Sequence, residues 1–135
     1  MGQDKSLTLG RKEIAELLPT TKDLSDIDAR KANLNKMDLS GCNLQRCNFS
    51  YTNLKDANLS NANLKEASLW NANLEGANLS NTNLEDADLD YAKLRGATLK
   101  GANIKRALLP TELISREEIM KSVKEGAKIG RFKYI

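Results

Sequence analysis

The sequence predicts an all-β solenoid, a chain wound into stacked coils of short β segments. A large apolar residue stands at every fifth position from Leu34 to Ile104 without a break, and a small residue, most often alanine, stands two positions before it. An interval of five fits neither the 3.6-residue period of a helix nor the two-residue period of a strand. A rule that holds in register over 32–106 indicates a repeat architecture, in which each unit buries its apolar face against its neighbours.

Each five-residue unit also predicts its own local shape. Its small and large apolar positions are separated by one polar residue, often asparagine, which is the alternation of a β-strand. The polar pair that follows is suited to a turn, because asparagine and aspartate hydrogen-bond nearby backbone groups and tolerate unusual dihedral angles. The large side chains expected to fill the interior are Leu34, Leu39, Leu44, Phe49, Leu54, Leu59, Leu64, Leu69, Leu74, Leu79, Leu84, Leu89, Leu94, Leu99 and Ile104.

Runs such as Ala57-Asn-Leu-Ser-Asn, Ala62-Asn-Leu-Lys-Glu and Ala77-Asn-Leu-Ser-Asn resemble the pentapeptide-repeat proteins, whose repeat is Ala-(Asp/Asn)-Leu-x-x. The resemblance covers more than half of the chain. It implies the fold of that family, a right-handed quadrilateral β-helix with four repeats in each coil, and therefore four to five coils here. The weaker repeats in 24–29 and 107–109 are expected to extend the same coil.

The chain therefore divides into three expected parts: an arm and capping helix in 1–23, the β-helix in 24–109, and a capping helix with a strand-like tail in 110–135. The first helix is expected in 10–18, with Ile14, Leu17 and Leu18 on one face and Pro19 ending it. It would cover the open end of the coil, since a bare edge pairs with other strands.

The second helix begins at a capping box in 115–118, where serine caps the helix start and glutamate reaches back. It is expected to end at Gly126 and to direct Ile119, Met120 and Val123 inward, over the other end of the coil.

The tail 128–135 alternates apolar and polar residues, with Phe132 and Tyr134 among basic ones, and this pattern predicts a strand. The favoured interpretation is that the strand lies on its own domain. The other interpretation is that Phe132 and Tyr134 belong to a strand that binds a partner by edge pairing.

Composition narrows the classes of partner. The 21 basic and 18 acidic residues leave a net charge of +3, which is too small to predict direct binding of nucleic acid or anionic lipid. No apolar run approaches the roughly 18 residues of a membrane span, and 1–9 has no apolar signal-peptide core. We therefore expect a cytoplasmic protein without membrane contact.

Few residues offer catalytic or metal-binding chemistry. The chain has no histidine, and its two cysteines, Cys42 and Cys47, occupy small inward positions where a free thiol behaves as a small apolar group. No glycine-rich phosphate loop is present, and the acidic residues fall on outward positions. The sequence thus predicts no catalytic residue, no metal ligand and no cofactor.

With four repeats per coil, residues twenty apart stack in columns on four faces. Two opposite faces alternate basic and acidic side chains, and a third carries serine and asparagine. The fourth face carries Tyr51, Trp70 and Tyr91, which include the only tryptophan. Because exposed aromatic residues that cluster are typical of interfaces, we expect this face to bind protein.

Two functions remain open from the sequence. The first is a non-catalytic scaffold or adaptor that binds another protein through its aromatic face or its tail, as a monomer or as a dimer through a capped end. The second is implied by a branch of the family that mimics DNA and inhibits DNA gyrase. Those members resemble long acidic rods, whereas 32–106 carries nine basic and eight acidic residues, and only Glu85, Asp86, Asp88 and Asp90 form an acidic group.

Overall fold

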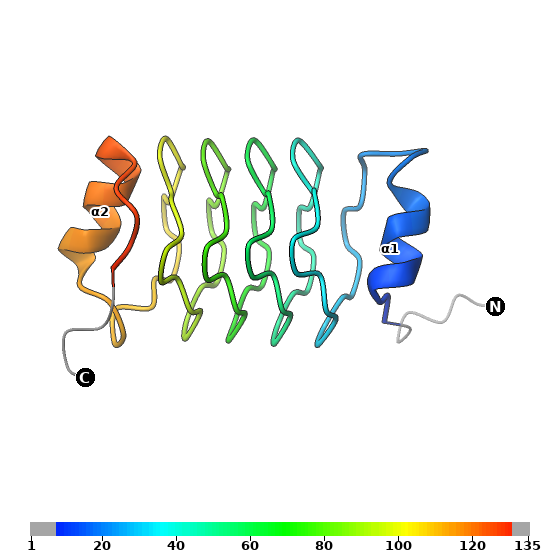
Figure 1. Cartoon of the computed structure of the whole chain (residues 1–135), viewed down its shortest axis with the longest axis horizontal. Coiled ribbons are helices and arrows are strands. Elements are labelled where there is room, and N and C mark those ends of the chain that lie inside the picture. Colours follow the sequence, from blue (N-terminus) through cyan, green and yellow to red (C-terminus); the bar gives the residue numbers. More distant parts are fainter. Residues whose placement is uncertain (1–7, 131–135) are drawn as a thin grey trace.

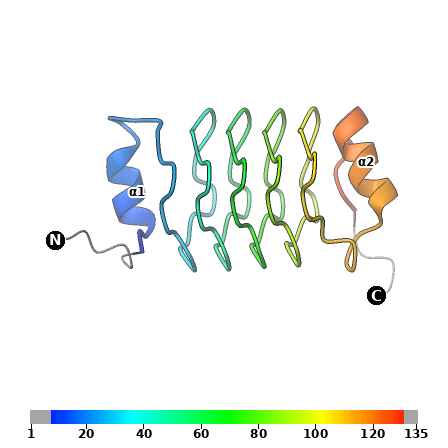
Figure 2. The same cartoon turned by 180° about the vertical axis from the view of Figure 1, so that it is seen from behind.

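The computed structural model describes residues 8–130, and its centre is a stack of four-sided coils between two helices (Figure 1, Figure 2). Parallel bridges join residues twenty apart, from Asp23 with Asn43 to Asp88 with Leu108. One bridge falls on each side of every coil, so each five-residue unit supplies one wall. This register confirms four repeats per coil and extends the coil into the weaker repeats at both ends.

The corners explain why the polar pair is needed. In the unit that begins at Leu54, the N–H of Ala57 donates to the carbonyl of Leu54 at 3.0 Å and closes a β-turn. The third residue of this turn, Asp56, has a φ of 58°, in the left-handed region that a type II turn requires. Asparagine, aspartate and glycine adopt this region most readily, and they fill many of the corresponding positions.

The polar residue between the two apolar positions also stabilises the corner. Asn58 Oδ1 accepts the N–H of Ser60 at 3.0 Å, and the same contact recurs where Asn48, Asn63 and Asn78 precede other corners. A short amide side chain therefore satisfies a backbone donor that the turn leaves unpaired. This contact accounts for the frequency of asparagine at that position.

The interior is filled as the five-residue rule predicts, with one exception. Fourteen of the expected core residues, Leu34 through Leu99, are buried. Ile104 is only partly buried, because it lies in the last coil and no further coil packs against it. The buried hydroxyl group of Thr52 at a small inward position donates to the carbonyl of Ala29 at 2.7 Å, so its polar atom is satisfied.

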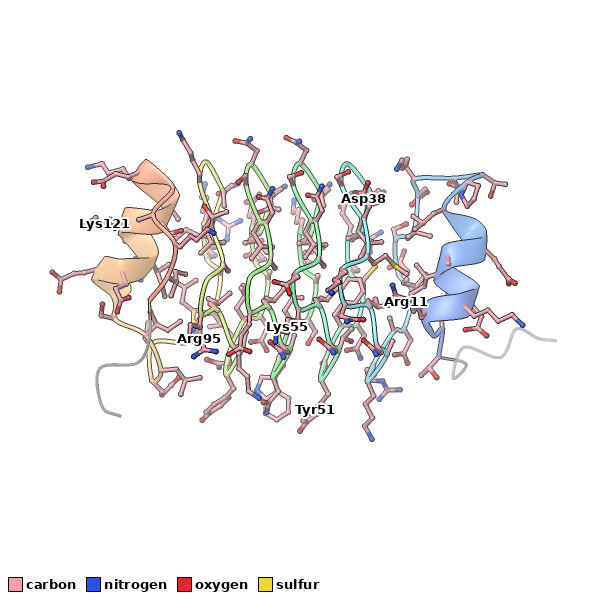
Figure 3. The ribbon with its side chains drawn as sticks, viewed as in Figure 1. Arg11, Asp38, Tyr51, Lys55, Arg95 and Lys121 are labelled. Atoms are coloured by element: carbon pink, nitrogen blue, oxygen red, sulfur yellow. The ribbon has the colours of Figure 1, made fainter. Side chains whose placement is uncertain are left out.

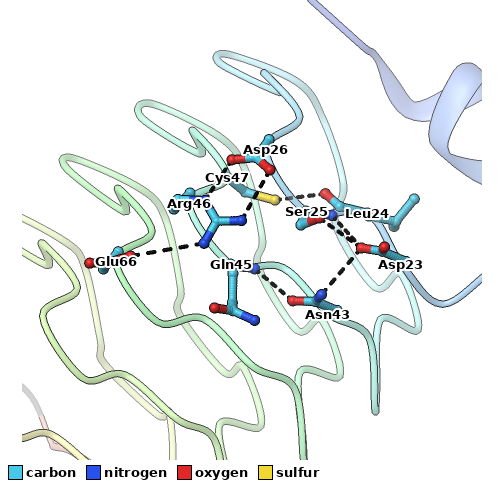
Figure 4. A network of polar contacts seen from close by, with 9 residues as sticks. All are labelled: Asp23, Leu24, Ser25, Asp26, Asn43, Gln45, Arg46, Cys47 and Glu66. Atoms are coloured by element: carbon cyan, nitrogen blue, oxygen red, sulfur yellow. Dashed lines mark hydrogen bonds and ion pairs between the residues drawn. The ribbon is translucent and has the colours of Figure 1, made fainter.

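Both cysteines are free and buried, as predicted. The thiol of Cys47 donates to the carbonyl of Leu24 at 2.9 Å (Figure 4). Burial raises the pKa of the Cys47 thiol to about 12 and also raises the pKa of the Cys42 thiol. Because the thiolate is the nucleophile and the metal ligand, both groups are inert fillers of the interior.

Helix α1 (Arg11–Leu17) covers the first coil. Ile14 is fully buried in the core, and Arg11 donates to the carbonyl of Asn35 at 2.9 Å, which holds the helix against the coil. The prediction that Leu17 faces inward is wrong, because its side chain is 37% exposed. Leu18, one turn after Ile14, is partly buried against the core as predicted, so the helix turns the side that carries Ile14 and Leu18 toward the coil.

Helix α2 (Arg116–Glu125) covers the other end and has the predicted N-cap and C-cap residues. The expected return contact of the capping box is not formed, because the Glu118 carboxylate accepts the N–H of Gly130 at 3.3 Å instead. Ser115 Oγ accepts the N–H of Glu118 at 3.1 Å, and Gly126 ends the helix with a left-handed φ of 79°. Ile119 is buried as predicted and Val123 partly so, but the expectation for Met120 is wrong, because Met120 is exposed.

Ser122 takes the inward place instead of Met120. Its buried Oγ accepts the N–H of Leu99 at 2.9 Å, and the carbonyl of Val123 accepts the N–H of Gly101 at 2.9 Å. In the other coils, the corresponding N–H groups donate to carbonyls of the next coil, as Leu79 does to Thr98. The helix therefore continues the hydrogen-bond ladder where the coil stops, and its register is set by this polar requirement.

The segment after α2 returns to the coil. Gly96 donates to the carbonyl of Ile129 at 2.6 Å, and the N–H of Ile129 donates to Ala97 at 3.0 Å. The described part of the tail thus lies on its own domain, as the favoured interpretation states, although 128–130 forms no regular strand. Phe132 and Tyr134 lie outside the described residues.

Replacing Ser122 with alanine is expected to lower the free energy of unfolding by about 1–3 kcal/mol, because the buried N–H of Leu99 would lose its acceptor. Chemical denaturation of the wild type and the variant measures this difference. The matched control is Lys121→Ala, which changes the neighbouring exposed residue of the same helix (Figure 3) and should cost far less. Equal losses in the two variants would contradict the capping role of Ser122.

Candidate protein-binding face

The three predicted aromatic residues lie together along one edge of the coils, and we call Tyr51, Trp70 and Tyr91 the aromatic ridge. The ring centroids of Tyr51 and Trp70 are 5.2 Å apart with planes at 84°, and those of Trp70 and Tyr91 are 6.1 Å apart at 83°. Both pairs are edge-to-face contacts, the arrangement that aromatic quadrupoles favour. Figure 3 shows Tyr51 projecting from the coils, away from the interior. The ridge therefore continues through three successive coils.

The backbone explains how the ridge projects. Tyr51 and Tyr91 both occupy the left-handed corner position, each with a φ of 59°, whereas Trp70 precedes such a corner. Bulky residues seldom adopt left-handed dihedrals, and asparagine fills the equivalent position after Trp70. The two tyrosines are 51% and 45% exposed, and Trp70 between them is partly buried. This partial burial differs from the fully outward position that the sequence suggests, because a tyrosine flanks the indole on each side.

The ridge has acidic residues at one end. Asp90 follows Trp70 in the same column, and its N–H donates to Asp88 Oδ1 at 2.9 Å. Partial burial raises the pKa of Asp90, and the carboxylates of Asp88 and Glu112 raise it further by repulsion. Within 8–130 none of these three carboxylates forms an ion pair, so this end of the ridge is negative.

The opposite end of the ridge is basic. Arg30 and Lys31 stand in the columns of Trp70 and Tyr51, two coils and one coil away respectively. Arg30 pairs with Asp28 at 2.8 Å, and Lys31 is exposed with no ion pair recorded among the described residues. The Arg30 guanidinium holds the pKa of Asp28 below its usual value. The basic end therefore keeps a net positive charge from Lys31.

Leu108 belongs to the same face and was missed by sequence reasoning. Its side chain is 54% exposed, and it bridges to Asp88, next to the acidic end of the ridge. Counting twenty residues from Asp88 would have placed it in an outward column, where an apolar side chain is unusual. Tyr51, Tyr91 and Leu108 are three of the five large apolar residues that the described chain exposes, the others being Leu17 and Met120 in the helices.

The two charged faces behave as the sequence predicts. Arg46 Nε lies 2.7 Å from Asp26, and its other nitrogen lies 4.0 Å from Glu66 (Figure 4). Arg106 binds both Asp86 and Glu85 on the same face. The remaining pair joins Arg95 and Glu75 on the opposite face at 3.7 Å. Exposed pairs of this kind contribute about 0–1 kcal/mol each, so these faces are solvated walls.

The acidic group predicted from the sequence is therefore divided by a corner of the coil. Glu85 and Asp86 pair with Arg106 and Asp86 lies near Lys65 and Lys105, whereas Asp88 and Asp90 lie on the aromatic side. The Arg106 guanidinium also holds the pKa of Asp86 below its usual value. No continuous acidic surface results from these four residues.

Metal and cofactor chemistry finds little support in residues 8–130. No three histidine, cysteine, aspartate or glutamate side chains gather there closely enough to hold a metal ion. Every buried side-chain nitrogen or oxygen in that range has a hydrogen-bond partner. A shallow hollow of about 380 Å³ is lined by Thr8, Arg30 and Lys31, and these residues include no acid, base or nucleophile arranged for reaction. In the same part of the chain, no helix is long and apolar enough to cross a membrane.

The family comparison decides the identity of the fold. The pentapeptide repeat model matches the chain in eight copies, over 23–61, 42–81 and 67–106. The chain belongs to the pentapeptide repeat family. The fold of this family is the right-handed quadrilateral β-helix, so both the fold and the resemblance predicted from the sequence are confirmed. A comparison of this pentapeptide repeat chain with curated proteins gave no match.

Two solved pentapeptide repeat proteins are similar to this chain. A pentapeptide repeat protein from the Arabidopsis thaliana thylakoid lumen is 36% identical with a TM-score of 0.59, over 59% of this chain and 55% of that one. Rfr23 from the cyanobacterium Cyanothece 51142 is 41% identical with a TM-score of 0.48, over 64% and 56%. The match thus spans little more than half the length of either relative.

A more distant match is QnrB1, a plasmid-mediated fluoroquinolone resistance protein, which is 22% identical with a TM-score of 0.29. The match covers 70% of this chain and 55% of that one. Neither this identity nor this TM-score extends the resistance role of QnrB1 to the present pentapeptide repeat chain.

Proposed function

We propose that this pentapeptide repeat protein is a non-catalytic scaffold that binds another protein through the aromatic ridge. The observation that carries the proposal is the edge-to-face stack of Tyr51, Trp70 and Tyr91 on the outside of the coil. Binding energy at protein interfaces concentrates in tryptophan, tyrosine and arginine residues that a polar rim surrounds. Here the rim is formed by Ser50 and Asp90, which flank Trp70 in its column.

The position of the ridge further supports a binding role. A rigid stack of parallel coils holds the three rings in one arrangement, so a partner would meet a preformed surface and little side-chain order would be lost on binding. The corner itself does not require tyrosine, since asparagine occupies the same backbone conformation at the equivalent Asn71. Two exposed aromatic rings at corners that a polar residue could fill therefore support a binding role.

The DNA-mimic alternative has weaker support. A protein that replaces DNA needs a long surface of negative charge. In this chain the basic and acidic side chains alternate, and Glu85 and Asp86 pair with Arg106, with Lys65 and Lys105 close to Asp86. A gyrase supercoiling assay separates the two functions, because only a DNA mimic should inhibit the enzyme.

The proposal is tested by capturing bound proteins from native extract with the wild type and with variants of the ridge. Trp70→Ala is expected to weaken partner binding by about 2 kcal/mol, roughly thirtyfold. The double change of Tyr51 and Tyr91 to asparagine removes both outer rings and suits the left-handed backbone at those positions. Both variants should therefore lose the same partner.

The matched control is Ser60→Ala on the opposite face, which should leave the captured partner unchanged. Thermal denaturation accompanies each variant, and Trp70→Ala should cost about 1–3 kcal/mol, since two aromatic contacts are lost but no core residue is removed. If the ridge variants capture the same partner as well as the wild type does, the ridge is not the binding site.

A further inference from the structure

The aromatic ridge is symmetric about Trp70. Tyr51 lies one coil before Trp70 and Tyr91 one coil after it, both in the same corner column, so reversing the direction of the coils exchanges the two tyrosines. The same reversal exchanges Lys31, one coil before Tyr51, with the segment one coil after Tyr91, where Glu112 lies. The order of side chains along the ridge is therefore base, ring, ring, ring, acid.

This order is self-complementary in charge as well as in shape. Lys31 is exposed at one end, and Glu112 is exposed at the other, where Asp88 and Asp90 add to the negative charge. When a second copy is turned by 180° and placed against this surface, the basic end of each copy faces the acidic end of the other. Each tyrosine then faces the other tyrosine across the interface, so the surface is complementary to itself. Two-fold interfaces have this property, because each contact from one residue to another occurs twice.

We infer that a second copy of this chain binds on the aromatic ridge in antiparallel orientation, with Trp70 at the two-fold axis and Lys31 of each copy against Glu112 of the other. This inference rests on the proposed function of the ridge as a protein-binding surface, and it names the partner. In such a pair Tyr51 of one copy meets Tyr91 of the other. The ring cluster forms the centre, and the charged pairs form the rim at both ends.

The ends of the coil favour this side-by-side arrangement over end-to-end stacking. At one end, the N–H of Leu9 donates to the backbone carbonyl of Asp28 at 2.7 Å, and Ile14 covers the interior. At the other end, Ser122 and Ile129 satisfy backbone groups of the last coil. Both capped ends therefore offer a second copy fewer unpaired backbone groups than an open coil would, and less exposed apolar surface than the ridge does. The side-by-side pair differs from the capped-end dimer that the sequence suggests.

The contact would be narrow, since it follows one corner of the coils. Interfaces smaller than about 1,200 Å² are typical of weak and transient complexes. We therefore expect dissociation in the micromolar range, and the full chain should be measured by sedimentation equilibrium from roughly 5 to 500 μM. Because Trp70 is the only tryptophan, its emission should shift to shorter wavelength over the same concentration range.

Charge reversal provides the decisive test. Lys31→Glu and Glu112→Lys each place like charges opposite one another twice in a dimer, and each should weaken self-association about tenfold or more. Glutamate suits the left-handed backbone at Lys31, because Glu66 occupies the same corner position in another repeat with a φ of 62°. An equimolar mixture of the two single variants should associate like the wild type, since every facing pair is then opposite in charge. The double variant, which carries both Lys31→Glu and Glu112→Lys, should also associate like the wild type.

Lys36→Glu is the control, because Lys36 occupies the same left-handed corner position in the next repeat, on a different edge of the coil. It should leave association unchanged. A chain that stays monomeric up to 500 μM, or single variants whose mixture is not rescued, overturns the inference. If the chain is monomeric but capture of another protein still depends on Trp70, the proposed function stands and only the identity of the partner is wrong.

Discussion

Deleting residues 114–135 is expected to make the remaining coil associate or precipitate. The deletion removes Ile114, Ile119 and Ile129, three buried residues that pack on the end of the core. At about 2 kcal/mol for each buried side chain, the loss is about 6 kcal/mol, which is comparable with the stability of a marginally stable domain. It also frees the N–H groups of Gly96 and Leu99, which then present an edge to other chains.

Light scattering and a thermal melt of the truncated protein measure this effect. A graded version within the full chain uses Ile119→Ser, which should destabilise strongly, beside Met120→Ser, which changes an exposed neighbour and should have little effect. A truncated chain that stays monomeric and keeps its thermal midpoint would show that the C-terminal segment does not act as a cap.

The repeat could be predicted in detail because its rules are local. Each five-residue unit determines its own inward side chains and its own corner. The unit twenty residues later, in the next coil, follows the same pattern. Once four repeats per coil are assumed, counting by twenty places any residue on its face. The pair of Arg46 with Asp26 follows from this count, and the same count places Tyr51 beside Trp70, because Asn71 stacks on Tyr51 and Trp70 precedes it.

The ends could not be predicted as well, because no repeating rule holds there. Helical spacing places Ile119 and Met120 next to each other on a broad apolar face, and hydrophobicity favours both. The structure instead turns Ser122 inward, because the coil presents an unpaired N–H group at Leu99 that needs an acceptor. The sequence of the helix contains no sign of that requirement, which arises from a residue in the preceding coil.

In the candidate site, too, some features could be predicted from the repeat and others could not. Its three aromatic residues were found by counting, since their columns depend only on the period. The partial burial of Trp70 was not found, because it depends on which rotamers Tyr51 and Tyr91 adopt beside it. Glu112 was not found either, because it lies after the last regular repeat and its position depends on how the chain leaves the coil.

Replacing Ala77 with leucine is expected to destabilise the fold by about 1–3 kcal/mol or more, although it adds only apolar volume. Ala77 is 1% exposed, and hydrogen bonds tie its wall to the coils on either side, where Ala57 and Ala97 occupy the same column. The same column holds Met37 in the first coil, where no complete coil packs on the outer side. A large side chain is thus accepted near an end but not between two close-packed walls.

The control for Ala77→Leu is Lys55→Leu, which adds an apolar side chain at an exposed position and should change the free energy of unfolding far less. Asn81 is less suitable as a control, because its φ of 58° lies in the left-handed region and leucine would add backbone strain there. Denaturant titration compares the two variants with the wild type. Because the small residue is what allows four walls to close around a narrow interior, equal losses would mean that close approach at Ala77 does not limit the packing of the coil.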